Sequence, residues 1–580
     1  MSKIFIKTLA FSVVIFSGCS IAAETQYSLP ESQRSLDLIQ KQRQQEKIYN
    51  EKLREKNIQQ EALSTVSELS DKEGKSKYHF MIKEIVVEGD DKYEFSPERN
   101  AIISGFLNLK MGEKEVMRLV GELTNFYISR GYVTTQITIV PGSLRSEKLV
   151  LKVLWGKLSG FLDNGNAPGW REKTRMFSAM PFTRGKVLTM SDIDQGLDNL
   201  LRVSSNDKLE IVPSEKDGHS LIDHKGEGVF PVSLHTGLNN SGYKDSGWYQ
   251  YYVSASIKNI IGLNDNINYF YSYNDLDSKP DNQYAKSVSL SLPLGYWSFD
   301  TSYYKSKYKK IVGGLWGGYQ SDGQSERTSL KVSRTLYRNS VGKLSGYVKL
   351  EKRENENFIM ESPVTISSKD YSSLTAGMNW VGSAAGGWAY LDFNMTKGVP
   401  WFSTAWNSDR DLDGFDLDYK KYNGMLNWSK RLAASDNGIV TLDYELNSGF
   451  QFTNDVLVSD AKMSVGDEYS VRGFKESSVS TERAAWISNT FKMPVNINYA
   501  RIYQLSPFTG FDIGLARRNC PPEVSSCDRD YLSGAVLGVK ANGKDFSGSF
   551  TAGWPIKRPA SLKNTPLDNQ VYYFNLDVGF

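Results

Sequence analysis

Val571-Tyr-Tyr-Phe-Asn-Leu-Asp-Val-Gly-Phe580 closes the chain, and it alternates between apolar and polar residues. Successive side chains of a strand point to opposite faces, so the segment has two different sides. The apolar side carries Tyr572, Phe574, Leu576, Val578 and Phe580, and the polar side carries Asn575, Asp577 and Gly579. A last strand of this kind is typical of a bacterial outer-membrane β-barrel, in which lipid meets one face and a wet lumen meets the other. We expect the terminal aromatic, Phe580, to be the barrel assembly signal.

The same alternation runs through the chain from about residue 230. In Trp248–Lys258, for example, every second residue is apolar or aromatic. We count sixteen such segments, centred near residues 236, 253, 270, 289, 302, 332, 347, 376, 392, 427, 444, 488, 511, 536, 550 and 575. Their spacing suits membrane strands of roughly 9–11 residues. The pattern predicts a transmembrane β-barrel of 16 antiparallel strands over residues 230–580.

The connections between these segments alternate between short and long. Asn339–Gly342 and Asn542–Lys544 are short, whereas the long ones include Lys310–Glu326, Asn355–Lys369, Pro400–Tyr419 and Asn454–Arg483. Short periplasmic turns and long outer loops characterise outer-membrane barrels. An even strand number places both ends of the barrel, and everything before it, on the periplasmic side.

Composition agrees with a barrel. Residues of the hydrophobic class make up 40% of the 580 residues, the mean hydropathy is −0.43, and no apolar run after the N-terminus reaches the roughly 20 residues of a membrane helix. A membrane protein without such helices has to span lipid as a closed barrel. The 32 tyrosines and 12 tryptophans suit membrane interfaces. A net charge of +3 is too small to indicate a nucleic-acid partner.

The N-terminus has the features of a secretory signal peptide, which we place at residues 1–23. Lys3 and Lys7 precede the apolar stretch 9–16, and cleavage is expected after Ala23. The competing interpretation is lipoprotein processing at Cys19, which ends the loose lipobox Phe16-Ser-Gly-Cys19.

Two cysteines remain in the mature chain if Cys19 is removed. Cys520 and Cys527 lie in one proline-containing outer loop, and an exported protein meets an oxidising compartment. We therefore predict a small loop-closing disulfide between them. Two cysteines make a poor metal site, and no metal is expected.

Three further regions lie between the signal peptide and the barrel. Residues 24–77 hold a polar helix and a linker; the helix has no wide apolar face, so it either stays solvated or lies in a polar cavity. Composition alone favours the solvated helix. Residues 78–155 and 156–229 each read as a small α+β module with the order strand, two helices, two strands.

Catalytic motifs are missing from the sequence. It contains four histidines, and none belongs to an H-E-x-x-H motif; G-x-S-x-G and glycine-rich phosphate loops are also lacking. His235 on the first strand is read as an ordinary lumen-facing polar residue. We expect no enzymatic activity and no cofactor.

One polar pair stands out. Arg472 lies in the longest outer loop, and Asp512 lies on the thirteenth strand between Gly510 and Gly514, on the face that points into the lumen. The missing side chains of the two glycines leave room for another segment. If the loop folds inward, the guanidinium can grip the carboxylate through paired hydrogen bonds.

At these residues the chain resembles the Omp85 superfamily. Val471-Arg472-Gly473-Phe474 looks like its VRGF/Y loop motif, and Gly510-Phe-Asp-Ile-Gly514 looks like the partner strand motif. The two modules look like POTRA domains. Further matching segments are Arg130–Tyr132, Asp192–Leu200, Ile211–Pro213, Gly237–Gly242 and Ile260–Asp265. Exactly two such modules after a plug helix resemble the two-partner secretion transporters (TpsB, haemolysin activator/secretion type). Departures are Asp194 and Asp198, where relatives often carry Glu, and Val203, where Leu or Phe is common.

The resemblance implies a function. The POTRA domains would bind a large β-helical TpsA-type exoprotein in the periplasm, and this partner would cross the barrel in extended form. The inward loop, locked by Arg472 and Asp512, would shape the pore, and the helix near residues 31–50 would be a removable plug. Other expected partners are outer-membrane lipid and, during biogenesis, the barrel-assembly machinery and periplasmic chaperones. The alternative is an Omp85-type factor that inserts other barrels; a passive porin has no need of the modules.

Overall fold

The computed structural model describes residues 31–64, 79–141, 147–227, 231–242, 247–275, 282–314, 317–364, 368–402, 417–475, 478–499, 501–519, 529–563 and 568–580. The predicted signal peptide, its alternative at Cys19, and both Cys520 and Cys527 lie outside these residues. The signal peptide and the disulfide therefore stay predictions.

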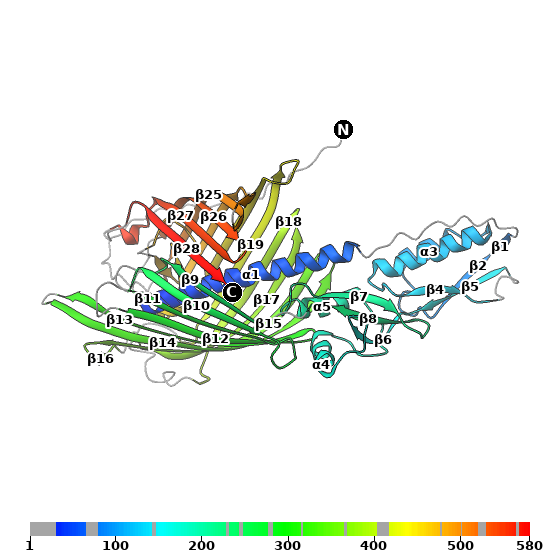
Figure 1. Ribbon diagram of the computed structural model, residues 1–580, viewed down its shortest axis with the longest axis horizontal. Coiled ribbons are helices and arrows are strands. Elements are labelled where there is room, and N and C mark those ends of the chain that lie inside the picture. Colours follow the sequence, from blue (N-terminus) through cyan, green and yellow to red (C-terminus); the bar gives the residue numbers. More distant parts are fainter. Residues whose placement is uncertain are drawn as a thin grey trace.

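A closed antiparallel barrel forms the larger part of the molecule (Figure 1). Its sixteen long strands among the described residues are β9 (Val232–Asn239), β10 (Tyr249–Lys258), β11 (Asn266–Asp275), β12 (Asn282–Leu294), β13 (Trp297–Gly314), β14 (Gly317–Asn339), β15 (Gly342–Ile359), β17 (Asp370–Ala384), β18 (Gly387–Val399), β19 (Lys420–Ala434), β20 (Thr441–Phe452), β23 (Arg483–Lys492), β25 (Ile502–Arg517), β26 (Arg529–Gly543), β27 (Phe546–Lys557) and β28 (Val571–Gly579). Two short strands, β16 (Ser362–Pro363) and β24 (Val495–Tyr499), extend the pairing of β15 and β25. The predicted 16-stranded barrel is confirmed.

The last strand closes the barrel by pairing with the first. Leu576 of β28 lies opposite Leu238 of β9, so the sheet has no free edge there. Tyr572 and Leu576 are each 46% exposed on the outer face, whereas Asn575 and Asp577 line the lumen. The two faces predicted from the closing sequence are thus the two faces of the barrel wall.

Several strands are longer than expected. β14 has 23 residues, and β13 and β14 continue as a paired hairpin through most of the predicted loop 310–326. β15 likewise runs to Ile359, inside the predicted loop 355–369. These segments carry charged residues on both faces, which imitates a loop in sequence. Beyond the lipid a hairpin needs no apolar face, so backbone pairing alone can extend it.

The first α+β module comprises β1 (Phe80–Ile82), β2 (Glu84–Glu88), α2 (Pro97–Ser104), β3 (Leu109–Met111), α3 (Glu113–Ser129), β4 (Gln136–Ile139) and β5 (Lys148–Leu154). Its sheet has the order β2-β5-β4, with β2 and β5 parallel. α3 buries Leu119, Leu123 and Tyr127 against this sheet. The short β1–β3 pair was not predicted.

The second module comprises β6 (Lys157–Asp163), α4 (Trp170–Ala179), α5 (Met190–Leu200), β7 (Lys208–Pro213) and β8 (His219–Lys225), with the sheet order β6-β8-β7. It adjoins the barrel, and the first module lies beyond it (Figure 1). The predicted element order is present in both modules, whereas the residues at which each domain begins and ends stay a prediction.

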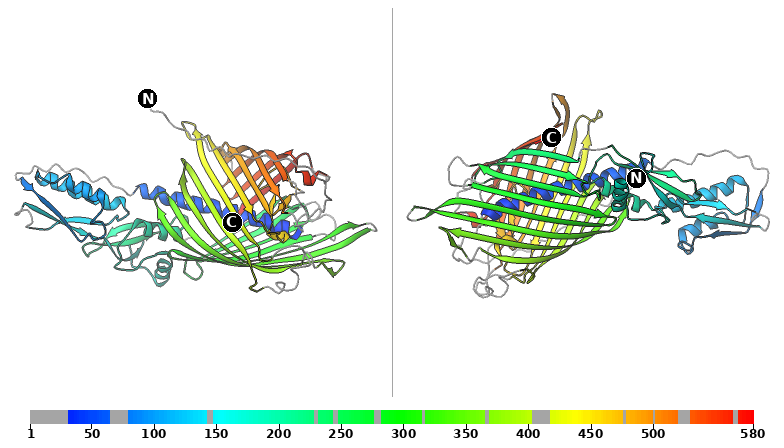
Figure 2. Two further views of the ribbon diagram at one scale, coloured as in Figure 1. Left: turned by 180° about the vertical axis from the view of Figure 1, so that it is seen from behind. Right: turned by 60° about the horizontal axis from the view of Figure 1, so that its bottom comes forward.

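A single helix, α1 (Glu31–Ser64), runs through the barrel interior (Figure 2). Its sequence is rich in Gln, Glu, Lys, Arg and Leu, and the absence of Gly and Pro favours an uninterrupted helix. At 34 residues it is longer than the plug expected at 31–50. Over the residues that the structure describes, no helix is both long and apolar enough to cross a membrane.

Candidate functional site

The segment between β20 and β23 folds inward and packs against the inner face of the barrel wall. It contains a short hairpin of β21 (Met463–Val465) and β22 (Val479–Thr481), preceded by the one-turn helix η2 (Ser459–Ala461). Apolar side chains of the segment and the wall form a common cluster of Val465, Val471, Phe474, Val479, Ala484, Trp486, Ala516, Leu532 and Leu562. This packing gives the segment a core of its own inside a largely polar lumen.

Arg472 in this inward segment forms a bidentate ion pair with Asp512 on β25. Its Nε and Nη2 atoms donate to the two carboxylate oxygens, both at 2.7 Å, and its backbone amide donates to Oδ2 at 2.9 Å. A further bond runs from Nη2 to the carbonyl oxygen of Asn489 at 3.1 Å. Asp512 is fully buried, so this fork is its means of compensating for lost hydration.

The glycines beside this fork are required by close approach. A Cβ at Gly510 would lie 2.4 Å from Nη2 of Arg472, and one at Gly514 would lie 2.8 Å from Cγ2 of Val471. On β26, a Cβ at Gly534 would meet the Arg472 carbonyl oxygen at 1.7 Å. Sequence reasoning identified the first two glycines and missed Gly534, which lies on a different strand.

Gly473 and Phe474 complete the anchored turn. Gly473 has a φ of +104°, a conformation that L side chains rarely adopt. Its amide donates to the Tyr573 hydroxyl oxygen at 3.3 Å, and that hydroxyl donates to the Phe474 carbonyl at 2.7 Å. All seven residues expected around the pore loop, Val471, Arg472, Gly473, Phe474, Gly510, Asp512 and Gly514, therefore lie in one assembly. Their role in transport stays a prediction.

Helix α1 contacts its surroundings mainly through polar atoms. Nζ of Lys41 donates to Asp467 of the inward segment at 2.7 Å and to the Ser464 carbonyl at 3.1 Å. Nζ of Lys52 donates to Ser429 of the wall at 2.7 Å. Five apolar side chains of α1 are also buried, namely Leu36, Leu38, Ile39, Ile48 and Ile58. Of these, Ile39 packs near Tyr252 and Phe270, and Ile48 packs near Val381 and Tyr390.

The periplasmic end of α1 meets the second module and the barrel at one carboxylate. Asp198 of α5 accepts from Arg54 of α1 at 3.1 Å, from Arg338 of β14 at 3.0 Å and from Lys343 of β15 at 2.7 Å. Glu55 of α1 is 3.1 Å from Arg338. Burial alone would raise the pKa of Asp198, but these cations hold it well below its usual value. Nothing in the sequence links partners so far apart in the chain.

The second module also holds a neighbouring turn of the barrel. Asn264, between β10 and β11, donates to the Arg175 carbonyl of α4 at 2.8 Å and to the Ser178 hydroxyl at 2.9 Å. Asp265 shapes this turn by accepting from the amides of Ile260 and Ile261 at 2.9 and 3.0 Å. The segment Ile260–Asp265 thus forms the seat of the module on the barrel rim.

A cavity of about 1070 Å³ remains between α1 and the wall formed by the first strands. Its wall is dominated by serine and asparagine side chains, among them Ser233, Ser254, Ser289, Ser329, Asn266 and Asn268. His235 also faces this space, with Nδ1 at 3.1 Å from Oδ1 of Asp577. Lys258, Lys331, Lys349 and Lys540 also line this space, so positive charges lie among its hydroxyl and amide groups.

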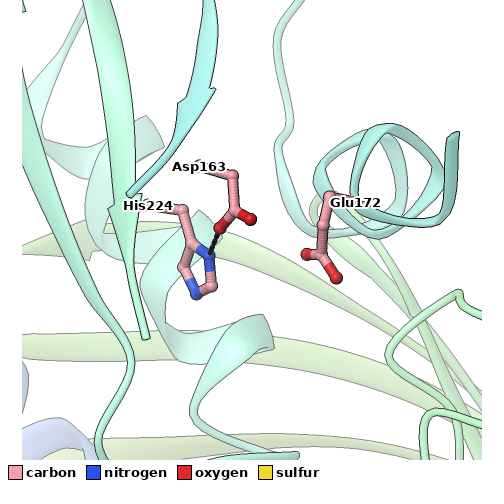
Figure 3. Close-up of side chains that lie close together, drawn as sticks. All are labelled: Asp163, Glu172 and His224. Carbon is pink, nitrogen blue, oxygen red and sulfur yellow. Dashed lines mark hydrogen bonds and ion pairs between the residues drawn. The ribbon is translucent and has the colours of Figure 1, made fainter. Parts of the chain in front are cut away.

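Asp163, Glu172 and His224 gather in the second module, close enough to suggest a cation site (Figure 3). Nδ1 of His224 lies 2.9 Å from Asp163, and Nε2 lies 3.3 Å from Asp207. Arg175 already supplies positive charge here, because it pairs with Asp207 and lies 3.7 Å from Glu172. Burial lowers the pKa of His224, whereas its hydrogen bonds with Asp207 and Asp163 raise it. Together the raising effects outweigh the effect of burial, so the pKa of His224 lies above its ordinary value. The cluster is accounted for as a charge network.

A closed barrel that contains an anchored inward loop and a helix, with two periplasmic α+β modules in front, defines an outer-membrane transporter of the Omp85 type. Residues 218–541 match the family model of the haemolysin secretion/activation protein ShlB/FhaC/HecB. Residues 80–156 match the ShlB-type POTRA domain, and residues 160–213 match a further POTRA domain model. The family match spans more than half of the chain, so the chain belongs to the haemolysin secretion/activation protein family. It is an outer-membrane transporter of two-partner secretion, with its POTRA domains in the periplasm.

Similar proteins agree with this assignment. The outer membrane transporter CdiB of Escherichia coli O6:K15:H31 (strain 536 / UPEC) is 28% identical, over 99% of this chain and 96% of the relative. The hemolysin transporter protein ShlB of Serratia marcescens is 28% identical, over 72% of this chain and 73% of the relative. The solved structure of CdiB from Escherichia coli has the same fold, with a TM-score of 0.84 at 23% identity over 96% of this chain and all of that one.

Proposed function

We propose that the chain exports a large secreted β-helical exoprotein of the TpsA type, which is a haemolysin, an adhesin or a contact-dependent toxin. Relatives that carry the names of haemolysin and CdiB transporters support this class of cargo. The POTRA domains bind the exoprotein in the periplasm, where an exposed sheet edge can add a strand from an unfolded chain. The exoprotein then crosses the barrel in extended form.

The observation that carries the proposal is the manner in which α1 occupies the lumen. The helix contacts the inward loop and the wall through polar side chains such as Lys41 and Lys52, and on withdrawal water can replace these hydrogen bonds at a net cost of about 0.5–1.5 kcal/mol each. Its withdrawal would open a polar channel, whereas the loop remains on its apolar cluster. In this proposal α1 is the removable plug, and the Arg472–Asp512 fork is the permanent lock of the pore loop.

We further propose how the barrel meets the membrane and the machinery that inserts it. The outer face of the barrel contacts outer-membrane lipid, and Phe580 serves as the signal by which the barrel-assembly machinery, aided by periplasmic chaperones, inserts the chain. Export uses no cofactor and no catalytic step by this chain, and it involves no nucleic acid. The predicted Cys520–Cys527 disulfide would close an outer loop distant from the lock, and mass spectrometry without reduction tests it.

Deletion of residues 31–50 tests the plug directly. This deletion removes the lumenal half of α1 and retains Arg54 and Glu55 at the periplasmic end. Single-channel conductance in planar bilayers should rise, while secretion of the exoprotein partner should stay largely intact. Unchanged conductance would show that the segment does not obstruct the pore.

An Omp85-type assembly factor is the second candidate, and two observations weigh against it. The family match is to secretion/activation proteins, and the lumen contains a helix that insertion of other barrels does not require. Depletion of the chain distinguishes the two functions. Loss of one secreted exoprotein supports export, whereas a general loss of outer-membrane barrels supports assembly.

A further inference from the structure

Helix α4 of the second module presents a free face with two large aromatic residues. Trp170 is 75% exposed and Phe177 is 67% exposed, and they lie seven residues apart, two turns along the same side of the helix. Lys173 lies between them and is also exposed. Large apolar side chains gathered on one exposed face usually mark a binding surface.

The position of α4 is fixed by the barrel. The backbone carbonyl oxygen of Ser178 accepts a hydrogen bond from the amide of Gly295, in the turn between β12 and β13, at 2.8 Å. Arg175 donates through Nε to Asn264 at 3.1 Å, and Arg171 contacts the carbonyl oxygen of Asn259. In Figure 1, α4 lies at the periplasmic rim, beside the end of β12 and outside the line of the wall. Its aromatic face is therefore held next to the place where the membrane meets the barrel.

The adjoining turn is apolar on its outer side. Ile260 and Ile261 are 51% and 58% exposed, and they follow β10 after Asn259. On the outward face of β10 and β11, Ile257 and Ile267 beside this turn are half-buried, and Val253 and Tyr269 further along are 40% and 41% exposed. The exposed apolar surface is thus continuous from the lipid-facing wall, through this turn, to the side of α4.

We propose that Trp170, Phe177, Ile260 and Ile261 form a lipid-docking surface that seats the second module on the periplasmic leaflet of the outer membrane. Tryptophan and other aromatic residues favour the headgroup region of a bilayer, where an apolar ring meets both acyl chains and water. Arg171 and Lys173 lie beside the rings and match the negative charge of anionic phospholipids. A lipid surface fits this patch because the patch continues the membrane-facing wall.

This docking adds to the proposed export function and does not depend on it. A module held against the leaflet and against two barrel turns keeps α5, and with it Asp198, below the mouth of the pore. The first module contacts the second: the Met190 amide donates to the Gly131 carbonyl oxygen at 2.7 Å, and Val133 packs against the core of the second module. The docking surface thus fixes the second module, which in turn holds the first.

The test uses the whole chain reconstituted in nanodiscs of phosphatidylcholine with phosphatidylglycerol, prepared with either ordinary or dibrominated acyl chains. Bromine quenches tryptophan only on close approach. Subtracting the emission of Trp170→Phe from that of the wild type isolates Trp170, and Trp155→Phe provides the matched control from the first module. We expect quenching of the Trp170 component several-fold stronger than that of Trp155.

A second arm uses the doubly substituted variant Phe177→Ser with Ile261→Ser. Both residues are exposed, so the variant should fold, and quenching of Trp170 should fall markedly because half of the apolar patch is lost. Equal quenching of Trp170 and Trp155 would overturn the proposal. The proposal would also be overturned if brominated lipid left the Trp170 emission unchanged and only added exoprotein altered it, since the patch would then be a protein-docking site.

Discussion

Two segments enter the same lumen and are held there by different physics. The inward loop is anchored by a buried carboxylate fork, by glycines that admit no side chain and by a cluster of apolar residues. Helix α1 is held mainly by ion pairs and hydrogen bonds; it also buries Leu36, Leu38, Ile39, Ile48 and Ile58, and of these Ile39 and Ile48 join apolar clusters. Buried apolar contacts and tight packing oppose removal into water, whereas a hydrogen bond can be exchanged for one to water at a net cost of about 0.5–1.5 kcal/mol. The comparison indicates a permanent constriction beside a removable plug.

The largest effect is expected from breaking the loop anchor. Arg472→Ala leaves the buried Asp512 carboxylate unpaired, which typically costs about 3–5 kcal/mol, enough to release the loop without unfolding the closed barrel. Secretion of the exoprotein should fall at least tenfold, a factor equal to about 1.4 kcal/mol, with normal heat-modifiable migration of the barrel on gels.

Arg431→Ala is the matched control, because Arg431 pairs with Asp443 at 3.3 Å on the exposed surface. It should leave secretion unchanged. Normal secretion by both Arg472→Ala and Asp512→Ala would show that the anchor is dispensable.

A glycine exchange isolates the packing part of the anchor from its charge. Gly534→Ala places a methyl group where the Arg472 carbonyl now lies, at 1.7 Å, so the loop has to shift. Secretion should drop severalfold, short of the loss caused by Arg472→Ala. Gly548→Ala on β27 serves as control, since its nearest contact would be an ordinary 3.6 Å to Leu576. Similar secretion by the two variants would remove close packing from the explanation.

The plug should respond to a smaller change at its periplasmic end. Asp198→Asn removes the negative charge shared by Arg54, Arg338 and Lys343, so α1 loses its link to the second module. Planar-bilayer recordings should show more frequent openings at unchanged barrel assembly. The exposed Asp217→Asn is the control. If Asp198→Asn stays as closed as the wild type, the ion-pair link does not retain the helix.

The smallest effect is expected from pH acting on the second module. The folded-state pKa of His224 is raised above its ordinary value of 6.5, so its pairing with Asp163 and Asp207 stabilises the module fully below that value. This stabilisation is lost as the pH rises through the folded-state pKa. Hydrogen exchange at β8 should therefore separate the wild type from His224→Gln at about pH 6 more than at about pH 8. A difference that grows with pH would contradict the assignment.

The local sequence pattern predicted most of the molecule, because alternate residues of a strand in the barrel wall face lipid and the polar lumen and differ in polarity accordingly. The strand positions, both modules and the contact between Arg472 and Asp512 follow from such patterns or from motif resemblance. The length of the strands beyond the lipid was not predicted, since charged residues such as Lys310, Asp322 and Glu326 look alike in a loop and in a solvated hairpin. The Asp198 network was also missed, because its partners lie more than a hundred residues away along the chain.

Crosslinking of each segment in place tests most directly whether the helix leaves and the loop stays. In a chain with Cys520 and Cys527 changed to serine, Gln44→Cys with Met425→Cys ties α1 to the wall, where the native side chains meet at 3.4 Å. Ser241→Cys with Glu468→Cys ties the loop to the end of β9, where the native side chains meet at 3.0 Å. After a short bifunctional thiol reagent with a reducible spacer, the first pair should abolish secretion until reductant is added, and the second should leave secretion intact. Secretion past a crosslinked α1, or its arrest by the crosslinked loop alone, would contradict the account.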